Sequence, residues 1–344
     1  MDNAKGYKAF KPGMICREKQ YAENTDYEEV GGKICEKGMM HYCVNPFDVL
    51  NFYDLVDESG KFSDFAEVKA LDQPISGSDG KFATKKLHIG AKLSFAGFIK
   101  ACIDYTKEQT IVNMPKSDVA TGDSAKIGSS GDYAKIGSSG DYAQIGSSGD
   151  YAKIGSSGYS AQIGSSGDSA KIGSSGDSAK IGSSGDSAKI GSSGYSAQIG
   201  SSGDYAKIGS SGDYAKIGSS GGYAKIGSSG DSAKIGSSGY SAKIGSSGYS
   251  AQIGSSGDYA KIGSSGDSAK IDSTGVDSVI CCAGHGCTVK AKIGSWITLA
   301  EWEYSEEKGR SVPRFVKTEY VDGEKIKPDT WYQLKNGEFV EVNR

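Results

Sequence analysis

The chain has 344 residues, of which 39 are basic and 42 acidic, so its formal net charge is −3. This balance favours neither nucleic acid nor an anionic membrane as a partner. No apolar run approaches the ~18 residues of a membrane span, and the first twenty residues lack the hydrophobic stretch of a signal peptide. Seven unevenly placed cysteines are typical of reduced thiols rather than of a disulfide framework. We therefore expect a cytoplasmic protein.

Residues 1–114 have an ordinary globular composition, from which we predict a small α+β domain. Asn45-Pro46 is typical of a helix start, because asparagine caps orphan amides and proline suits the first helical position. Residues 65–71 alternate as a half-buried strand should, and residues 86–93 are a second predicted strand. Ser94 is expected to cap a helix that follows this second strand.

Two short motifs resemble a family of bacterial and phage proteins of unknown function. These proteins open with G-Y-K-x-F and soon carry a C-x-x-G-x-H-x-C-x-N-P-x-D-V motif. The matching residues here are Gly6, Tyr7, Lys8, Phe10, Cys35, Gly38, His41, Cys43, Asn45, Pro46, Asp48 and Val49, with one extra residue between Gly38 and His41. Such proteins also carry Ser/Gly nonapeptide arrays and a tail like residues 294–302. The resemblance implies a shared architecture but brings no activity.

The cysteines and histidine of this motif are candidate metal ligands. Cys35, His41 and Cys43, with Cys16, combine the thiolate and imidazole groups that zinc prefers. Their spacing is not one of the usual finger or ribbon patterns, so buried thiols and a hydrogen-bonded core histidine are the favoured interpretation. A catalytic Cys–His pair remains an alternative. We expect no cofactor.

Residues 122–271 repeat G-[DY]-[YS]-A-[KQ]-I-G-S-S, with 17 isoleucines at nine-residue intervals. Alanine and isoleucine stand two apart, as in Ala134 and Ile136, and so share one face of a short strand. Tyr133 and Lys135 are then expected on the opposite face, and the following G-S-S-G segment is expected to form a turn. Because such a short strand cannot bury its face alone, the units are predicted to stack into a parallel β-solenoid.

The substitutions within the array indicate how many units make one coil. Numbered by their isoleucines, the units that carry Gln144, Gln162, Gln198 and Gln252 are all odd, whereas all eight even units keep lysine. Two unlike faces, and therefore an 18-residue coil of two nonapeptides, explain this bias; a three-unit coil remains an alternative.

We therefore predict a mainly β protein with three parts. A two-sided β-roll over residues 115–293 follows the α+β domain, and an antiparallel β cap over residues 294–344 ends the chain. Residues 315–321 are expected to pair with residues 295–304, and Asp322-Gly323 and Asn336-Gly337 are predicted hairpin turns. The two end parts are expected to protect the open strand edges of the solenoid.

The array surface sets the expectations for partners. It carries 13 lysines and 12 aspartates, which we expect to pair across each strand and which argue against nucleic acid. A calcium-binding β-roll is disfavoured because the aspartate position is interrupted by tyrosine and glycine, and a flat threonine row for ice binding is lacking. Tyrosine is common in interfaces, although a stabilising ladder is an equal alternative. The candidate contact residues are Tyr133, Tyr142, Tyr151, Tyr205, Tyr214, Tyr223 and Tyr259.

A second group of soft ligands follows the array at Cys281, Cys282, His285 and Cys287. Adjacent cysteines of a strand point to opposite faces, so convergence of all four on one metal is not expected. A last solenoid coil with small buried thiols is the favoured interpretation.

From these features we predict a non-catalytic, rod-like structural or protein-interaction protein. We expect its partner to be an unidentified protein, with a dimer or trimer of this chain as one option, and we expect neither a nucleic-acid nor a membrane partner. The alternative is a phage or mobile-element counter-defence inhibitor that binds a host protein or sequesters a small nucleotide inside the infected bacterial cell. A third hypothesis makes residues 1–114 an enzyme that uses His41 or Cys43.

Overall fold

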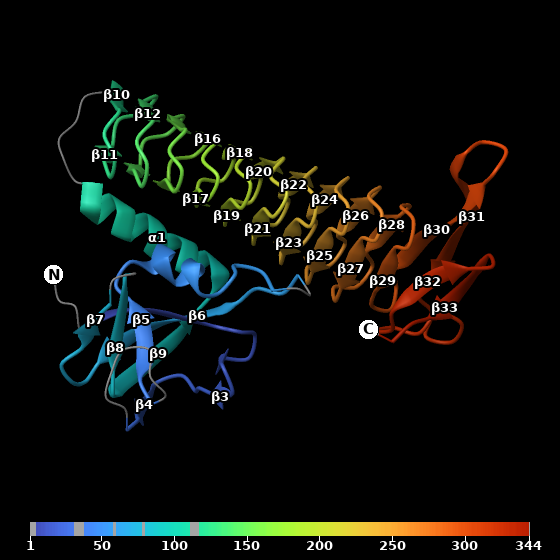
Figure 1. The fold of residues 1–344 in the computed structure, drawn as a ribbon, viewed down its shortest axis with the longest axis horizontal. Coiled ribbons are helices and arrows are strands. Elements are labelled where there is room, and N and C mark those ends of the chain that lie inside the picture. Colours follow the sequence, from blue (N-terminus) through green and yellow to red (C-terminus); the bar gives the residue numbers. More distant parts are fainter. Residues whose placement is uncertain (1–4, 31–37, 58–59, 78–79, 111–116, 344) are drawn as a thin grey trace.

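The computed structural model describes residues 5–30, 38–57, 60–77, 80–110 and 117–343. It is mainly β: a parallel β-solenoid of about 10 turns lies between an antiparallel N-terminal sheet domain and an antiparallel C-terminal cap (Figure 1). The predicted fold class is confirmed.

The N-terminal domain is built on a seven-stranded antiparallel sheet with the order β4-β9-β6-β1-β5-β8-β7. A short hairpin, a 3-10 helix and one α-helix complete it. The elements are β1 (Lys5–Phe10), β2 (Ile15–Cys16), β3 (Lys19–Gln20), β4 (Thr25–Glu28), β5 (Met40–Cys43), η1 (Pro46–Asn51), β6 (Asp64–Ala70), β7 (Ile75–Ser76), β8 (Lys81–Thr84), β9 (Lys86–Leu93) and α1 (Phe95–Thr110).

Both predicted helix starts are confirmed. The Asn45 side chain accepts a hydrogen bond from the Phe47 amide at 3.0 Å, although the element it caps is the 3-10 helix η1. The Ser94 hydroxyl accepts from the Gly97 amide at 3.1 Å and so caps α1. Capping side chains satisfy amides that have no partner inside the helix.

Two long parallel sheets form the solenoid. The even sheet consists of β10 (Ser117–Ala120), β12 (Lys135–Ser138), β14 (Lys153–Ser156), β16 (Lys171–Ser174), β18 (Lys189–Ser192), β20 (Lys207–Ser210), β22 (Lys225–Ser228), β24 (Lys243–Ser246), β26 (Lys261–Ser264), β28 (Val279–Cys282), β30 (Trp296–Ser305) and β31 (Arg310–Tyr320). The odd sheet consists of β11 (Lys126–Ser129), β13 (Gln144–Ser147), β15 (Gln162–Ser165), β17 (Lys180–Ser183), β19 (Gln198–Ser201), β21 (Lys216–Ser219), β23 (Lys234–Ser237), β25 (Gln252–Ser255), β27 (Lys270–Ser273), β29 (Thr288–Lys290), β32 (Tyr332–Lys335) and β33 (Glu338–Glu341).

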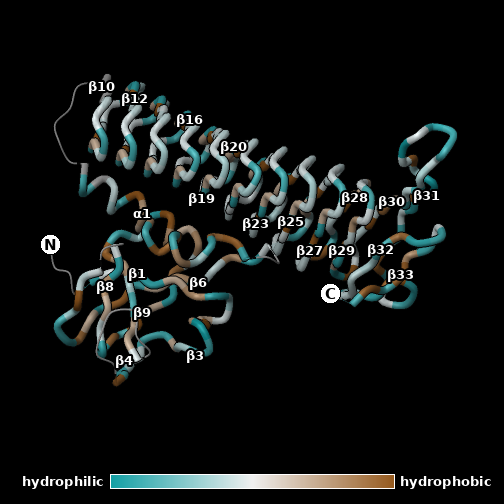
Figure 2. The backbone as a smooth tube through the Cα atoms, in the orientation of Figure 1, coloured by the Kyte–Doolittle hydropathy of each residue, from teal (hydrophilic) through white to brown (hydrophobic). Residues whose placement is uncertain are grey.

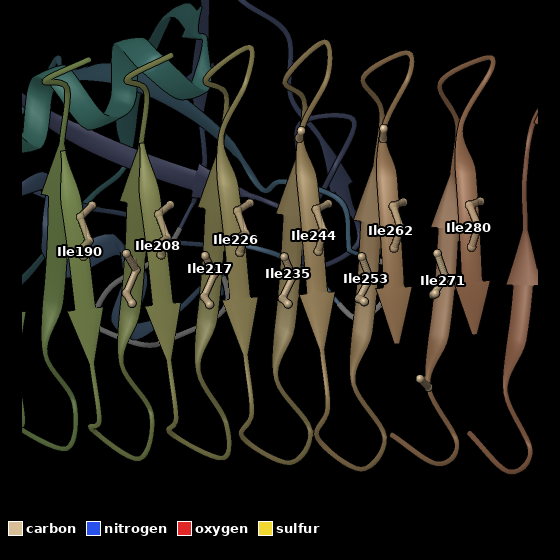
Figure 3. Close-up of a cluster of buried hydrophobic side chains, with 14 of the residues drawn as sticks. Ile190, Ile208, Ile217, Ile226, Ile235, Ile244, Ile253, Ile262, Ile271 and Ile280 are labelled. Atoms are coloured by element: carbon tan, nitrogen blue, oxygen red, sulfur yellow. The ribbon is translucent and has the colours of Figure 1, made fainter. Parts of the chain in front are cut away.

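The strand register confirms a coil of two nonapeptides. In the even sheet Ile136 pairs with Ile154, and in the odd sheet Ile145 pairs with Ile163, an offset of 18 residues in both. The isoleucines form two facing rows inside the roll (Figure 3) and are at most 4% exposed. All four glutamines fall in the odd sheet, as the two-face hypothesis requires.

The expected phase of strand and turn is partly wrong. Each strand runs from the lysine or glutamine through isoleucine and glycine to the first serine, so that glycine and serine belong to the strand rather than to a turn. The first serine points inward and is buried, as at Ser147 and Ser165. Isoleucine, alanine and serine therefore fill the interior together, and hydrophobic and hydrophilic residues alternate along each coil (Figure 2).

Each turn is formed by the Gly-Asp-Tyr-Ala part of the unit and its variants. Tyr133, Tyr142 and Tyr151 lie in these turns with φ between 57° and 60°, and not on the strand face opposite isoleucine, so that expectation is wrong. The preceding glycine has no room for a side chain, because a Cβ at Gly203 would overlap the carbonyl oxygen of Gly185 one coil earlier. Close stacking of the turns thus fixes this glycine.

The N-terminal domain does not cap the end of the solenoid, contrary to expectation. It lies along the odd sheet, where α1 crosses strands β11 to β19 and Gly60 packs on Gly254 of β25 (Figure 1). The reason is that its hydrophobic helix face needs a surface to cover, and the side of the roll supplies a flat column of glycines against which Phe95, Ile99 and Ile103 pack.

The C-terminal cap continues both sheets. Strand β30 pairs in parallel with β28 and antiparallel with β31, which confirms the predicted pairing of residues 315–321 with 295–304. Asn336-Gly337 connects the β32–β33 hairpin as predicted. Asp322-Gly323 does not form a hairpin turn, because β31 and the next strand, β32, belong to different sheets; the Asp322 carboxylate instead accepts three backbone amides of the connecting loop.

Candidate functional site: the two faces of the solenoid

In both sheets the same two positions of the repeat point outward, away from the interior of the roll. The residue before isoleucine, lysine or glutamine, points outward, and so does the glycine after isoleucine. Along each sheet these positions form a lysine column and a glycine column, because every strand pairs in register with the next. The two faces therefore start from the same chemistry.

On the odd sheet the glycine column is covered by helix α1. A Cβ at Gly218 would lie 2.9 Å from the Phe95 ring, and one at Gly182 would lie within 3.9 Å of Ile99 and Ile103. Phe95, Ile99 and Ile103 are one helical turn apart, and each turn reaches about one coil further along the rod. The helical pitch of ~5.4 Å is close to the strand spacing of ~4.8 Å, which lets one helix follow the column over several coils.

The outward lysine and glutamine side chains of the odd sheet bond to the N-terminal domain. Gln162 Nε2 donates to Asp48 at 3.3 Å, and Gln198 Nε2 donates to the Leu50 carbonyl at 3.1 Å. Lys180 Nζ donates to Asn51 at 2.6 Å and to the Phe47 carbonyl at 3.2 Å. This column is therefore part of the domain interface.

Burial explains why glutamine replaces lysine only on this face. Lys180 is buried, and burial lowers the pKa of its ammonium group, while the nearby Asp48 carboxylate opposes that shift. Burial likewise raises the pKa of Asp48. A charged side chain that loses water is costly unless it is paired, and the neutral glutamine avoids that cost.

The other array lysines of the odd sheet, from Lys216 to Lys270, also have partners. Lys216 and Lys234 form ion pairs with Asp54, the second at 3.7 Å. Lys270 lies 4.7 Å from the centre of the Trp331 ring in the cap.

The even sheet shows the opposite situation. Its lysine column consists of Lys135, Lys153, Lys171, Lys189, Lys207, Lys225, Lys243 and Lys261, all exposed. Within the described ranges no ion pair or side-chain hydrogen bond joins any of these eight lysines to another residue. The seven glycines from Gly155 to Gly263 have open space where a side chain would stand. The two columns line an open groove of about 1230 Å³ that extends from Lys135 to Lys261.

The aspartates of the array do not neutralise this column, so the expected Asp–Lys pairing across each strand is wrong. They lie in the turns, and most of their carboxylates accept backbone amides of the next coil, as Asp123 accepts from Asp141 at 3.0 Å and Asp150 from Asp168 at 2.8 Å. Opposite charges that balance in the sequence are thus separated in space. The even face is cationic although the array as a whole is nearly neutral.

The seven candidate tyrosines lie along the two edges of the roll and are 45–68% exposed. Tyr133 stacks on Tyr151 and Tyr205 on Tyr223, with ring centres 5.1 and 5.3 Å apart. Stacking of this kind stabilises neighbouring coils, so the ladder alternative describes the geometry of these four tyrosines. The role of all seven as contact residues stays a prediction.

The N-terminal candidates are only partly brought together. Cys16, His41 and Cys43 line a cavity of about 240 Å³, together with Lys8, Arg17, Phe52, Tyr53 and Lys81, whereas Cys35 lies outside the described residues. The buried Lys8 Nζ donates to the His41 carbonyl at 2.8 Å, and Tyr53 donates to Cys16 Sγ at 3.0 Å. Arg17 and Lys81, together with Lys8, whose pKa burial lowers, make the cavity a better site for an anion than for zinc.

The C-terminal candidates divide between the two sides of β28 and the following turn. Cys282 and Cys287 are buried in the solenoid core, and Cys281 is exposed on the even face. The His285 amide donates to Asp267 in the turn. In the described part of the chain no three His, Cys, Asp or Glu side chains are placed to hold one metal ion.

Comparison with known proteins adds one finding. The sequence profile of a family described as a domain of unknown function (DUF7666) matches residues 4–101, which is the N-terminal domain without the end of α1. Comparisons with curated proteins and with solved structures found no match. Among the described residues, no helix has the length and hydrophobicity needed to cross a bilayer.

Proposed function

We propose that the protein is a non-catalytic, rod-shaped scaffold and that its even sheet is the surface on which another protein binds. One observation carries this proposal. The lysine and glycine columns of the odd sheet are covered by the N-terminal domain of the same chain. The same columns of the even sheet are exposed, and within the described residues their lysines have no side-chain partner.

The energetics of the lysine column support a role outside folding. Like charges directly opposite one another on neighbouring strands destabilise a sheet. The odd sheet shows that the fold accepts glutamine at this position, since Gln144 and Gln162 are adjacent in register there. Eight lysines on the even face therefore serve something other than stability of the array.

The proposal is tested by affinity purification of the full-length protein from its native cells after chemical cross-linking. The test variant replaces Lys171, Lys189, Lys207 and Lys225 by glutamine, and the control replaces the same four residues by arginine, which keeps the charge. We expect wild type and the arginine variant to capture the same partner and the glutamine variant to lose it. A partner retained by all three proteins would contradict the proposal.

A second candidate function rests on the N-terminal cavity. Lys8, Arg17 and Lys81 line it, and Phe52 and Tyr53 add aromatic rings, with Lys81 Nζ 4.3 Å from the centre of the Phe52 ring. This combination of cations and aromatic rings suits a small anionic ligand with a ring, such as a nucleotide. This arrangement supports the counter-defence alternative of nucleotide sequestration. Calorimetry with a panel of mono- and cyclic nucleotides tests it, with Lys8→Met and Lys81→Met as variants; absence of binding across the panel would rule it out.

The enzyme hypothesis for residues 1–114 uses the same cavity. Should any turnover of a bound ligand be seen, a His41→Ala, Cys43→Ala variant that keeps full activity would show that these two side chains take no part in it.

A further inference from the structure

We infer that the partner of the even sheet is an amphipathic α-helix with one apolar ridge flanked by carboxylates. This inference rests on the function proposed above and specifies the chemistry of the partner. The groove of the even sheet is the place where this helix would lie, along the axis of the rod.

The odd sheet shows in the same molecule how a helix binds this repeat. There α1 lies along the glycine column, and Phe95, Ile99 and Ile103 follow one another at about one helical turn per coil. The glycine column of the even sheet has the same register and the same absent side chains, and it is open. A helix with apolar residues at every third and fourth position therefore matches the groove.

The charges of the partner follow from the same comparison. The N-terminal domain meets the odd lysine column with carboxylates, Asp48 near Lys180 and Asp54 on Lys216 and Lys234. The even column contains eight lysines and no glutamine, so its partner needs more carboxylates than the N-terminal domain provides. Burial of the lysine column against an uncharged helix would leave it unpaired.

The length and the ends of the groove restrict the helix further. Eight coils at ~4.8 Å spacing extend over roughly 34 Å, which corresponds to a helix of about 22 residues. Beyond Lys261 the column becomes apolar, since Val279, Trp296 and Tyr320 occupy the next three register positions and are 42–52% exposed. The end of the helix over the cap should therefore carry a large apolar side chain in place of a carboxylate.

A second copy of this chain does not fit the groove. Two even sheets face to face would bring two lysine columns together, which is repulsive. The apolar residues of α1 are already buried, Ile99 and Ile103 against the odd sheet and Phe98 against Phe65 of the N-terminal domain, each at most 2% exposed. The partner is therefore a different protein.

The inference is tested with the full-length protein and a synthetic 22-residue helical peptide that carries a leucine ridge, flanking glutamates and one terminal tryptophan. A peptide of the same composition in scrambled order removes the ridge and keeps the charge. The protein variants are the four-lysine glutamine variant described above and Gly191→Val/Gly209→Val, which fills the groove without touching a lysine. Valine fits these two positions because nothing lies within 4 Å of their Cβ sites, and circular dichroism checks that each variant is folded.

We expect fluorescence anisotropy to show binding of the designed peptide to wild type, with Kd at least tenfold higher for the scrambled peptide and for each protein variant. Equal Kd values for both peptides, or no effect of the valines, would overturn the inference. So would tighter binding of duplex DNA, polyphosphate or anionic lipid vesicles, tested side by side, because these polyanions have no apolar ridge. Failure of the peptide with continued lysine-dependent capture of a cellular partner would overturn the helix alone and leave the proposed function intact.

Discussion

The two sheets of the solenoid are built from one nonapeptide, yet one is covered by the N-terminal domain and the other is exposed. The odd sheet is covered by α1 and η1, and its outward residues bond to Asp48, Asn51 and Asp54. The even sheet has the same strands in the same register, but its lysines and glycines are exposed. At the outward strand positions the difference in sequence is a lysine-to-glutamine change in four of nine odd units.

One repeat thus produces the same outward columns of lysine and glycine on two sheets, and the protein buries one pair of columns and exposes the other. A flat column of glycines with a polar column beside it accepts a helix, as the odd sheet shows. Where burial is permanent, lysine is replaced by glutamine or is paired; where the surface is exposed, all lysines remain. The substitutions therefore record which face is buried.

The largest effect is expected from filling the glycine column on the covered face. In Gly218→Val the new side chain would meet the rings of Phe62 and Phe95, whose nearest atoms lie 2.7 and 2.9 Å from the Cβ site. We expect a loss of about 3 kcal/mol, since overpacking a tight interface forces backbone shifts. Gly227→Val on the even sheet meets nothing within 4 Å and should leave stability unchanged. Urea unfolding of the two variants measures the difference, and equal stabilities would contradict the stated roles of the two faces.

A second, smaller effect concerns pH. Burial lowers the pKa of Lys180 below its ordinary value of 10.5, so between the lowered pKa and 10.5 the unfolded chain holds a proton that the folded chain has released. Stability from this residue should therefore rise with pH in that window and be constant above it. The Lys180→Gln variant should lose this rise. The Lys189→Gln variant, which changes the next strand along the chain in the exposed even sheet, should keep it. Burial also lowers the pKa of Lys8, but Lys8 is present in all three proteins. Differences between their thermal melts from pH 7 to pH 10.5 therefore measure the contribution of Lys180.

The ion pairs at the domain interface should contribute less. Asp54 is 41% exposed and its partners Lys216 and Lys234 are about one fifth exposed, so solvent screens the interaction. We expect Asp54→Asn to cost about 0.5–1 kcal/mol, decreasing as salt increases. A cost that is independent of salt concentration would show that Asp54 acts through packing or hydrogen bonding.

The smallest effect is expected on the exposed lysine column, and its sign is opposite. Replacing Lys189, Lys207 and Lys225 by glutamine removes repulsion between neighbouring strands, so the melting temperature should rise by about 1–2 °C at low salt and be unchanged at 0.5 M salt. A fall in melting temperature at low salt would mean that these lysines stabilise the array through contacts that the fold does not show.

Much of the architecture could be predicted from the sequence because the repeat reports its own periodicity. The nine-residue spacing of isoleucine defined the interior, and the restriction of glutamine to odd units predicted the two unlike sheets. The phase within the unit was harder. Alternation predicts Tyr133 on a strand face, although it lies in a turn, because alternation alone does not show where a strand begins.

The candidate site could not be predicted, because it depends on where the N-terminal domain lies. Total charge suggested a neutral surface, but the aspartates turn toward backbone amides at the edges, while the lysines align on the sheets. The bias that keeps lysine in all even units contained this information. This bias follows from the position of α1, which covers the odd sheet.

The central claim is that the even sheet, and not another surface of the rod, is where a partner binds. A photo-activatable benzoylphenylalanine placed at Ser193, which is exposed beside the groove, tests it directly in native cells. The same group at Lys308 in the exposed β30–β31 turn of the cap is the matched control. We predict a discrete cross-linked product from Ser193 and none from Lys308. No product from Ser193, or the same product from both positions, would contradict it.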